Sequence, residues 1–173
     1  MSINLKPYGE QGEAPAISFD VRRDKDVLEI EFTIAGLPTP MPASNIIGVR
    51  RSELWLDTCF ECFLGSAEEA AYLEFNFSPK GDWQCYAFED YRQGMQVSDA
   101  WRPRQFSISA AAQQPQQLRF RMASDDGWPI SPRVQGAAII VWERAMLYYA
   151  SDHGDQPDFH NPALFLEGTN FGL

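Results

Sequence analysis

The sequence predicts an all-β fold, an antiparallel β-sandwich with few or no helices. Eight or nine short segments alternate apolar and polar residues, at a spacing of roughly ten residues. Clusters of Gly, Pro, Asp, Asn and Ser separate these segments and are typical of turns. No segment shows a strong helical period, apart from a brief turn expected over residues 66–71. No repeat or linker divides the chain, so residues 1–173 are expected to form one domain.

The first half of the chain predicts a hairpin and then three neighbouring strands. Residues 1–16 hold two prolines and two glycines and are expected to be an irregular or edge segment. Residues 17–34 alternate on both sides of an RDKD turn, which is typical of a hairpin. The three prolines of residues 36–45 predict a loop. Residues 54–92 contain the three strands, with SPKGD as the turn between the second and third.

The second half predicts two further pairs of strands joined by long connections. The turn-forming composition of residues 124–133 separates the two pairs. Residues 91–104 form a connection before the first pair, and the tail after residue 151 is loop with one short closing strand. The expected strands cover residues 105–112, 117–123, 136–144 and 146–151.

Alternation within residues 54–92 divides each strand into a core face and a mixed face. Successive side chains of a strand point to opposite sides of the sheet. In the second strand Leu73, Phe75 and Phe77 therefore share one face, opposite Glu74 and Asn76. In the first strand the mixed face holds Trp55, Asp57, Cys59, Glu61 and Phe63. A carboxylate, an amide and aromatic rings on one face predict a recognition surface on a β-sheet.

Composition excludes several classes of partner. The net charge is −10 with 14 scattered basic residues, which argues against nucleic acid and anionic membranes. No run approaches the ~18 apolar residues of a membrane span. Three cysteines do not suggest a disulfide framework, and the N-terminus lacks the apolar core of a signal peptide. A cytoplasmic protein of a reducing compartment is therefore expected.

Four linked motifs resemble those of a bacterial group of DOMON-like domains, which are similar to family 9 carbohydrate-binding modules. They are LWLDTCFECFL (54–64), YLEFNFSPKGDW (72–83), YAFEDYRQGM (86–95) and PDFHNPALF (157–165), and the resemblance spans about residues 17–168. The resemblance implies a β-sandwich with its ligand site on one sheet or at one end. In family 9 modules tryptophans clamp a sugar while polar side chains bind its hydroxyls. Other DOMON relatives hold haem between Met and His ligands.

The first hypothesis is a non-catalytic module that binds a small polar ligand, most plausibly a sugar or glycan. Carboxylates and amides accept and donate hydrogen bonds to vicinal hydroxyls, and an aromatic face covers the C–H surface of a sugar. The alternative for the same residues is a solvated outer sheet face with tryptophans at the core edges. The expected ligand-binding residues are Trp55, Glu61, Glu74, Asn76, Trp83, Tyr86, Arg92 and His160.

Two further functions stay open at this point. A haem or other redox-cofactor domain would use His160 or His153 with a methionine, for which Met95, Met122 and Met146 are available. A protein–protein interaction module would use an exposed aromatic edge instead. No cofactor is expected under the first hypothesis.

Two further hypotheses, a glycosidase pair and a CxxC metal or redox site, have weaker support from the sequence. Glu61 and Glu74 could form a glycosidase pair, but nothing in the sequence marks one as the acid. Cys59 and Cys62 match CxxC, yet strand positions i and i+3 point to opposite faces, so no metal or redox site is expected.

Charged loop residues are also considered for structural roles. Arg92 is a candidate to pair with Glu61 or Glu74, to fix a carboxylate or to bind an anionic ligand, and a structural ion pair is favoured. His160 is expected as a loop organiser or a ligand contact. Arg50 and Arg51 precede the first strand of the recognition surface and are considered as the rim of the ligand site. A calcium site is also considered, although no spacing of the acidic residues supports it; its ligands would be Asp57, Glu61, Asp152, Asp155 and Asp158.

Overall fold

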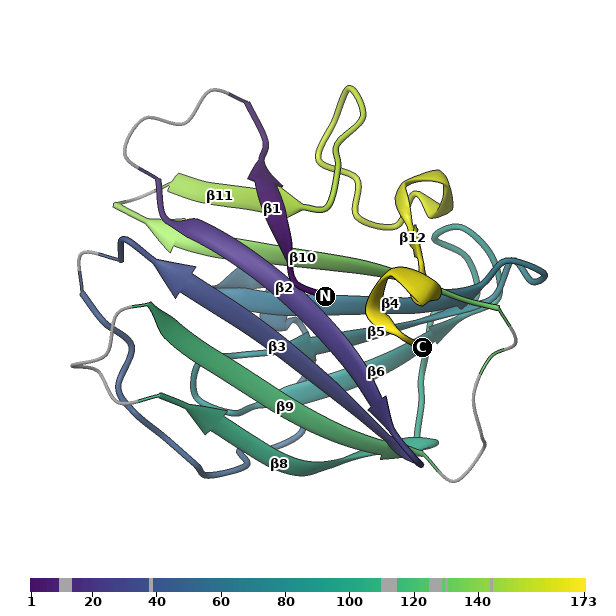
Figure 1. The fold of residues 1–173 in the computed structure, drawn as a ribbon, viewed down its shortest axis with the longest axis horizontal. Coiled ribbons are helices and arrows are strands. Elements are labelled where there is room, and N and C mark those ends of the chain that lie inside the picture. The colour runs from purple at the N-terminus through teal and green to yellow at the C-terminus, as the bar shows by residue number, and fades with distance from the viewer. Residues whose placement is uncertain (10–13, 38, 110–114, 125–128, 130, 144) are drawn as a thin grey trace.

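The computed structural model consists of short strands connected by loops and three turns of 3-10 helix (Figure 1). It describes residues 1–9, 14–37, 39–109, 115–124, 129, 131–143 and 145–173. The strands are β1 (Ile3–Pro7), β2 (Ala16–Asp24), β3 (Val27–Ala35), β4 (Cys59–Ser66), β5 (Tyr72–Phe77), β6 (Trp83–Phe88), β7 (Gln96–Val97), β8 (Trp101–Ile108), β9 (Gln116–Ser124), β10 (Pro132–Trp142), β11 (Ala145–Ala150) and β12 (Leu166–Glu167). The 3-10 turns are η1 (Leu54–Leu56), η2 (Pro162–Leu164) and η3 (Gly168–Phe171).

The strands form one continuous sheet that curls over itself. Its order is β7-β6-β5-β4-β10-β11-β1-β2-β3-β9-β8, and β12 pairs with β10. The first residues of β1 pair with β2, whereas Lys6 and Pro7 pair with β11, so β1 joins the two parts. We call β2, β3, β9 and β8 the front layer, and β7, β6, β5, β4, β10 and β11 the back layer (Figure 1). Every strand ladder in the described part of the chain is antiparallel, and the fold is all-β as predicted.

The main core fills the space between the two layers. Aromatic rings meet there from both sides: Phe77 of β5 stacks on Phe120 of β9, with ring centroids 3.9 Å apart. Phe60 of β4 lies 5.1 Å from Phe32 of β3. All four rings are almost fully removed from water. Burying such side chains contributes about 1.5–3 kcal/mol each, so the alternating apolar residues hold the curled sheet closed.

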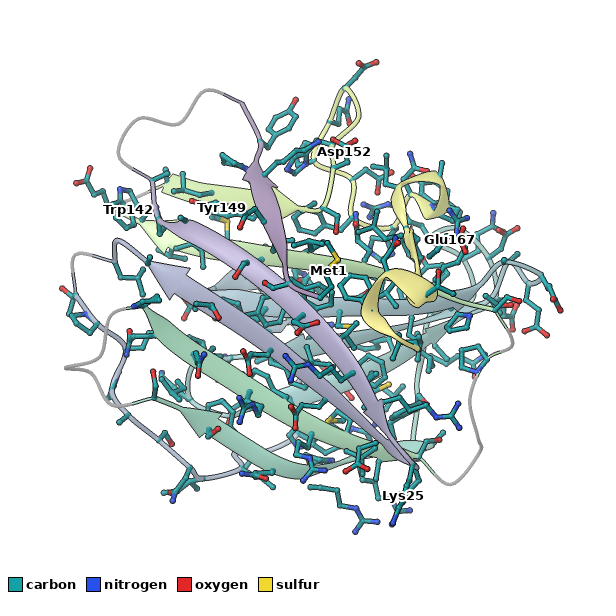
Figure 2. All side chains as sticks on the ribbon, viewed as in Figure 1. Met1, Lys25, Trp142, Tyr149, Asp152 and Glu167 are labelled. Atoms are coloured by element: carbon teal, nitrogen blue, oxygen red, sulfur yellow. The ribbon has the colours of Figure 1, made fainter. Side chains whose placement is uncertain are left out.

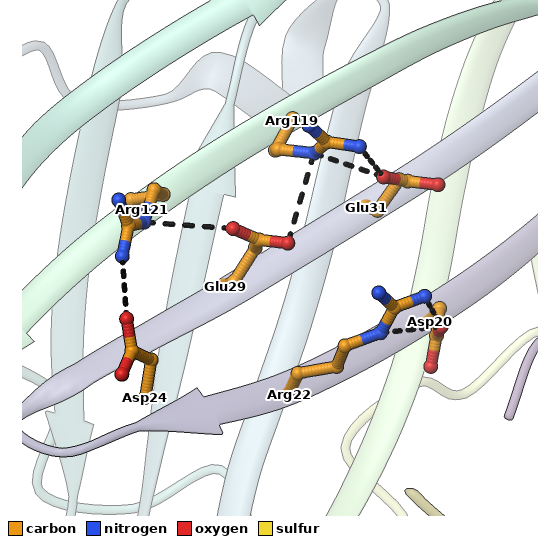
Figure 3. Close-up of polar contacts among 7 residues, drawn as sticks. All are labelled: Asp20, Arg22, Asp24, Glu29, Glu31, Arg119 and Arg121. Atoms are coloured by element: carbon orange, nitrogen blue, oxygen red, sulfur yellow. Dashed lines mark hydrogen bonds and ion pairs between the residues drawn. The ribbon is translucent and has the colours of Figure 1, made fainter.

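The outer face of the front layer is charged and internally paired (Figure 3). Glu29 of β3 contacts Arg121 of β9 at 3.5 Å and Arg119 at 3.7 Å. Arg119 also bonds Glu31, and Arg22 of β2 bonds Asp20 on its own strand. Partly exposed pairs of this kind contribute only about 0.2–1 kcal/mol each. The charged side chains of this face are therefore engaged with one another along the sheet.

The outer face of the back layer carries a second apolar cluster. Figure 2 shows side chains around the C-terminal loops, near the labelled Asp152 and Glu167. Segments outside the ladders cover this cluster, including η1 and the loop that follows β11. Its buried members are Leu54, Cys59, Phe63, Tyr72, Tyr86, Phe88, Ala137, Ile139, Ala150, Phe159 and Phe165.

Some element boundaries differ from the sequence prediction. The strand expected from residue 54 begins at Cys59, because Glu53 adopts a left-handed backbone (φ 59°) and residues 54–56 form η1. Residues 1–16 contain β1, and the strand expected at residue 105 begins at Trp101. Residues 66–71 contain no helix.

The two strand pairs predicted for the second half of the chain are present, although some of their predicted residues are not among those that the structure describes. Residues 110–112 and 144 of the predicted strands, and Trp128, lie outside the described residues. Trp142 is half-buried at the end of β10. Among the described residues, no helix is long and apolar enough to cross a membrane.

Gly136 marks the closest approach of the two layers. It lies in β10 opposite Cys62, and an added Cβ would stand 2.4 Å from Cγ of Phe19 in β2. Phe19 is fully buried and cannot swing into solvent. We expect Gly136→Ala to lower the free energy of unfolding by about 1–3 kcal/mol, measured by denaturant titration.

Gly154→Ala is the matched control, because nothing lies within 4 Å of its added Cβ. It should change stability by less than about 0.5 kcal/mol. Equal midpoints for the two variants would show that the layers are not in close contact at Gly136.

Candidate functional site

A cavity of about 460 Å³ opens on the outer face of the back layer. Two buried carboxyl groups lie in it among aromatic and aliphatic side chains. Its wall residues come from η1, from the five strands β4, β5, β6, β10 and β11, from the turn after β6 and from the loop after β11. The residues that line it are Trp55, Glu61, Glu74, Phe88, Arg92, Met95, Ile139, Tyr148, Pro157, Phe159 and His160.

Strand register places the polar residues of the cavity together. Glu61 of β4 is directly opposite Asn76 of β5, and Glu74 lies two residues earlier on the same face of β5. Tyr86 of β6 is opposite Glu74, and Ala137 of β10 is opposite Glu61. The small side chain of alanine leaves room above the floor of the cavity beside Glu61.

The two carboxyl groups are almost completely buried. Glu61 is 3% exposed and Glu74 4%, so both lie far below the surface exposure usual for glutamate. Asn76 Nδ2 donates to Glu74 Oε1 at 2.6 Å, and the Cys59 thiol donates to Asn76 Oδ1 at 3.4 Å. Asn76 therefore fixes the orientation of Glu74 from below.

Burial changes the acidity of both groups. Desolvation raises the pKa of Glu74 to about 7, although its bond from Asn76 acts in the opposite direction. Desolvation, followed by the charge of Glu74, raises the pKa of Glu61 well above its ordinary value. Burial thus favours the protonated form of both groups, and a protonated carboxyl group can both donate and accept hydrogen bonds.

His160 borders the carboxyl groups and is held by a tyrosine. Its Nδ1 lies 2.8 Å from the Tyr72 hydroxyl, which also accepts the backbone N–H of Arg92 at 3.2 Å. A hydroxyl proton donated to Nδ1 assigns the ring proton to Nε2, which lies 3.7 Å from Glu74 Oε2. Desolvation, aided by the charge of Arg92, lowers the pKa of His160 to about 4, so the ring is neutral at pH 7.

Arg92 forms its ion pair with Asp158. The guanidinium contacts Asp158 Oδ1 at 2.9 Å, and the Tyr91 hydroxyl donates to Asp158 Oδ2 at 2.6 Å. Both bonds lower the pKa of Asp158, against the effect of its desolvation. The structural ion pair expected for Arg92 is therefore present, but its partner is Asp158 and not Glu61 or Glu74. The guanidinium is bound to the loop after β11 and closes one side of the cavity.

Aromatic rings form much of the wall. Trp55 packs on Tyr86 with ring centroids 5.7 Å apart, and Tyr148 packs on Phe159 at 6.2 Å. Trp55 and Tyr148 are half-buried, which leaves part of each ring accessible from the cavity. A flat ligand ring with a C–H surface would find matching faces here.

The structure brings together five of the eight predicted site residues and places three elsewhere. Trp55, Glu61, Glu74, Arg92 and His160 line the cavity. Asn76 and Tyr86 lie beneath it, the first bonded to Glu74 and the second packed under Trp55.

Trp83 does not reach the cavity. It packs against the main core on the opposite face of β6, and the Arg50 guanidinium lies 5.0 Å from its ring. Trp83 is opposite Phe77 of β5, so alternation itself assigns it to the core face. Arg50 and Arg51 were expected at the rim of the site. Arg50 instead bonds Gln84 and Asp99, and Arg51 contacts Asp82.

Several lining residues were not predicted. Phe88 shares a face with Tyr86 by alternation, so that signal was present in the sequence. Ile139 lies in a continuous apolar run that hides which face it occupies, and Pro157 and Phe159 enter from a loop. Only the fold brings that loop, and Tyr148 of β11, next to β4 and β5.

The histidine and methionine contacts do not fit a haem ligand pair. Both ring nitrogens of His160 are directed at protein groups, Tyr72 and Glu74, although Met95 lines the same cavity. Met122 is buried in the main core, and His153 Nε2 bonds the Lys6 carbonyl oxygen, as expected for a loop organiser.

No metal cluster is formed within the described ranges. No group of three or more His, Cys, Asp or Glu side chains is placed to hold an ion. Asp152 pairs with Lys6 and Asp158 with Arg92, so the aspartates considered for calcium are dispersed. Cys59 and Cys62 lie in different apolar clusters on opposite faces of β4, as the strand geometry predicts.

The raised pKa of Glu74 predicts a pH-dependent stability. Between pH 4.5, its ordinary value, and about 7, the folded state binds more protons than the unfolded state. This contribution to stability is therefore complete at low pH and is lost as the pH rises through about 7. Glu74→Gln should consequently gain stability relative to the wild type as the pH rises through this window, measured by urea titrations at several pH values.

Glu29→Gln, in the ion-paired front layer, is the matched control and should not gain stability in the same way. His160 acts with the opposite sign, because its lowered pKa costs stability as the pH falls from 6.5 towards about 4. Comparing each variant with the wild type at the same pH removes that contribution. A pH-independent difference for Glu74→Gln would contradict the buried environment described for Glu74.

Comparison with solved structures identifies two proteins of similar fold. One is a proposed carbohydrate-binding protein from Bacteroides uniformis: the TM-score is 0.65 at 13% identity, over 96% of this chain and 84% of the other. The second is a family 9 carbohydrate-binding module from Caldicellulosiruptor kristjanssonii in complex with glucose, with a TM-score of 0.54 at 12% identity, over 96% and 82%. No protein-family profile and no curated protein sequence matches the chain. At these identities the likeness shows the fold, which resembles that of a family 9 module.

Proposed function

We propose that this chain is a non-catalytic binding module for a small polar ligand, and that the ligand is a carbohydrate. The single observation that carries the proposal is the cavity itself, in which aromatic walls stand over the buried carboxyl groups of Glu61 and Glu74. Its volume of about 460 Å³ lies within the ~300–1,000 Å³ typical of small-ligand sites. The two solved structures of similar fold are described as carbohydrate-binding, which supports the same ligand class.

Each lining group has a role in this proposal. Trp55 covers one C–H face of the sugar ring, while Glu61 and Glu74 exchange hydrogen bonds with its hydroxyls. His160 and Arg92 donate further hydrogen bonds from the loop side. Neighbouring Asn76 and Tyr86 act as positioning residues, because they hold Glu74 and Trp55 without lining the cavity.

Binding accounts for the carboxyl pair better than glycosidic cleavage. A glycosidase places its two carboxyl groups on either side of the scissile bond. Glu61 and Glu74 instead project from adjacent strands on the same floor. The four motifs quoted from the sequence keep membership of the DOMON-like group as part of the proposal.

Trp55→Ala tests the proposed site. A thermal-shift screen of mono- and disaccharides first selects a sugar, and isothermal titration then compares affinities. We expect Trp55→Ala to weaken binding at least about tenfold, equivalent to about 1.4 kcal/mol, because the ring surface under the sugar is lost.

Leu56→Ala is the adjacent control, since Leu56 is 66% exposed and does not line the cavity. Its affinity should match that of the wild type. A sugar that binds Trp55→Ala as tightly as the wild type would place the site elsewhere. Failure of every sugar in the screen would remove the carbohydrate proposal.

A further inference from the structure

Within the described residues, no lysine or arginine forms an ion pair with the two carboxyl groups of the cavity, although the charge of Arg92 acts on both from the cavity wall. Arg92 is engaged by Asp158, and His160 is neutral at pH 7 because its pKa lies at about 4. In the described part of the chain, the ion-pair contact of Glu74 is with that neutral ring, and Glu61 has none with a lysine or arginine. Ionising both glutamates would therefore leave negative charge in a desolvated space.

This arrangement differs from the rest of the protein's charged surface. In the front layer each of Asp20, Glu29 and Glu31 has an arginine within 4 Å (Figure 3). Those carboxylates are satisfied by the chain itself. Glu61 and Glu74 are buried without such a partner, so a cationic ligand would compensate the charge of their ionised forms.

The cavity walls also favour a cation. The negative π faces of aromatic rings attract ammonium groups, more strongly where the site is shielded from water. Trp55, Phe88, Tyr148 and Phe159 all line the cavity that contains the two carboxyl groups. An ammonium that enters such a site loses its hydrating water, and the carboxylates and aromatic ring faces replace those lost contacts.

We propose that the bound carbohydrate carries a protonated amine, with its ammonium on the carboxyl pair Glu61–Glu74 and its ring over Trp55. The inference rests on the proposed function and specifies its ligand as an amino sugar. A neutral sugar would bind the carboxyl pair through neutral hydrogen bonds only. An ammonium would form charge-assisted hydrogen bonds, which are about twice as strong as neutral ones.

Proton release accompanies this mode of binding. The groups that face the carboxyl pair are His160, Arg92, Tyr72 and Cys59, and Asp158 is paired with Arg92 behind them. An ammonium favours the ionised form of both glutamates, so its binding displaces a proton from the pair near neutral pH. A neutral sugar has no comparable effect.

The test compares three matched sugars on the full chain by isothermal titration at pH 7. They are glucosamine hydrochloride, glucose and N-acetylglucosamine, which differ at one ring substituent, with sodium chloride added to equalise ionic strength. We expect glucosamine to bind at least tenfold more tightly than either neutral sugar. Titrations in two buffers of different ionisation enthalpy should show proton release for glucosamine only.

Glu61→Gln should remove most of the preference for glucosamine, whereas Glu29→Gln in the front layer should retain it. If Glu61→Gln does not fold, the three-sugar comparison on the wild type still decides the question. Glucose or N-acetylglucosamine binding as tightly as glucosamine would overturn the amine inference and leave carbohydrate binding intact. No binding of any of the three would overturn the amine inference, and the wider sugar screen then judges the proposed function.

Discussion

The burial of two glutamates on one face of a β-sheet is the constraint on which the candidate site depends. Glu61 and Glu74 are side by side because β4 and β5 pair in one register, which places Glu61 opposite Asn76. A slip of one residue would move both carboxyl groups into the main core, where Phe60 and Phe75 now pack. The main core therefore fixes the register, and the register fixes the site.

The two layers of the curled sheet differ in how their carboxyl groups are buried and paired. The front layer leaves Glu29 and Glu31 partly exposed and pairs them with arginines of the neighbouring strand β9. The back layer buries its carboxyl groups under loops, where desolvation raises the pKa values of Glu61 and Glu74. Buried groups with perturbed pKa values within a cavity are candidates for functional sites. This contrast distinguishes the candidate site from the ion-paired surface within a single sheet.

The loops over the back layer complete the site. Tyr72 connects them to the sheet, since its hydroxyl bonds both His160 of the C-terminal loop and the backbone of Arg92. Arg92 in turn holds Asp158, so two segments distant in the sequence form one wall. Its backbone is left-handed (φ 53°), a strained conformation for a residue with a side chain, and such strain is frequent at binding sites.

Alternation predicted the fold class and the polar floor, because both depend on the period of two along a strand. Glu61, Glu74 and Asn76 were found in this way, and the same rule applied to β6 would have rejected Trp83 and selected Phe88. Alternation could not reveal that Arg92 pairs with Asp158. That contact depends on how a loop folds back over the sheet, and loop paths carry no comparable period.

Carbon-13 NMR of the glutamate side-chain carboxyls, with and without sugar, tests whether the buried groups of Glu61 and Glu74 form the ligand site. We expect Glu74 to titrate near pH 7 and Glu61 to titrate well above the ordinary range of a carboxyl group. Both carboxyl signals should also move when the sugar is added. The signals of Glu29 and Glu31 should stay in place. Ordinary titration of both buried groups, or ligand-induced shifts confined to other glutamates, would contradict the account.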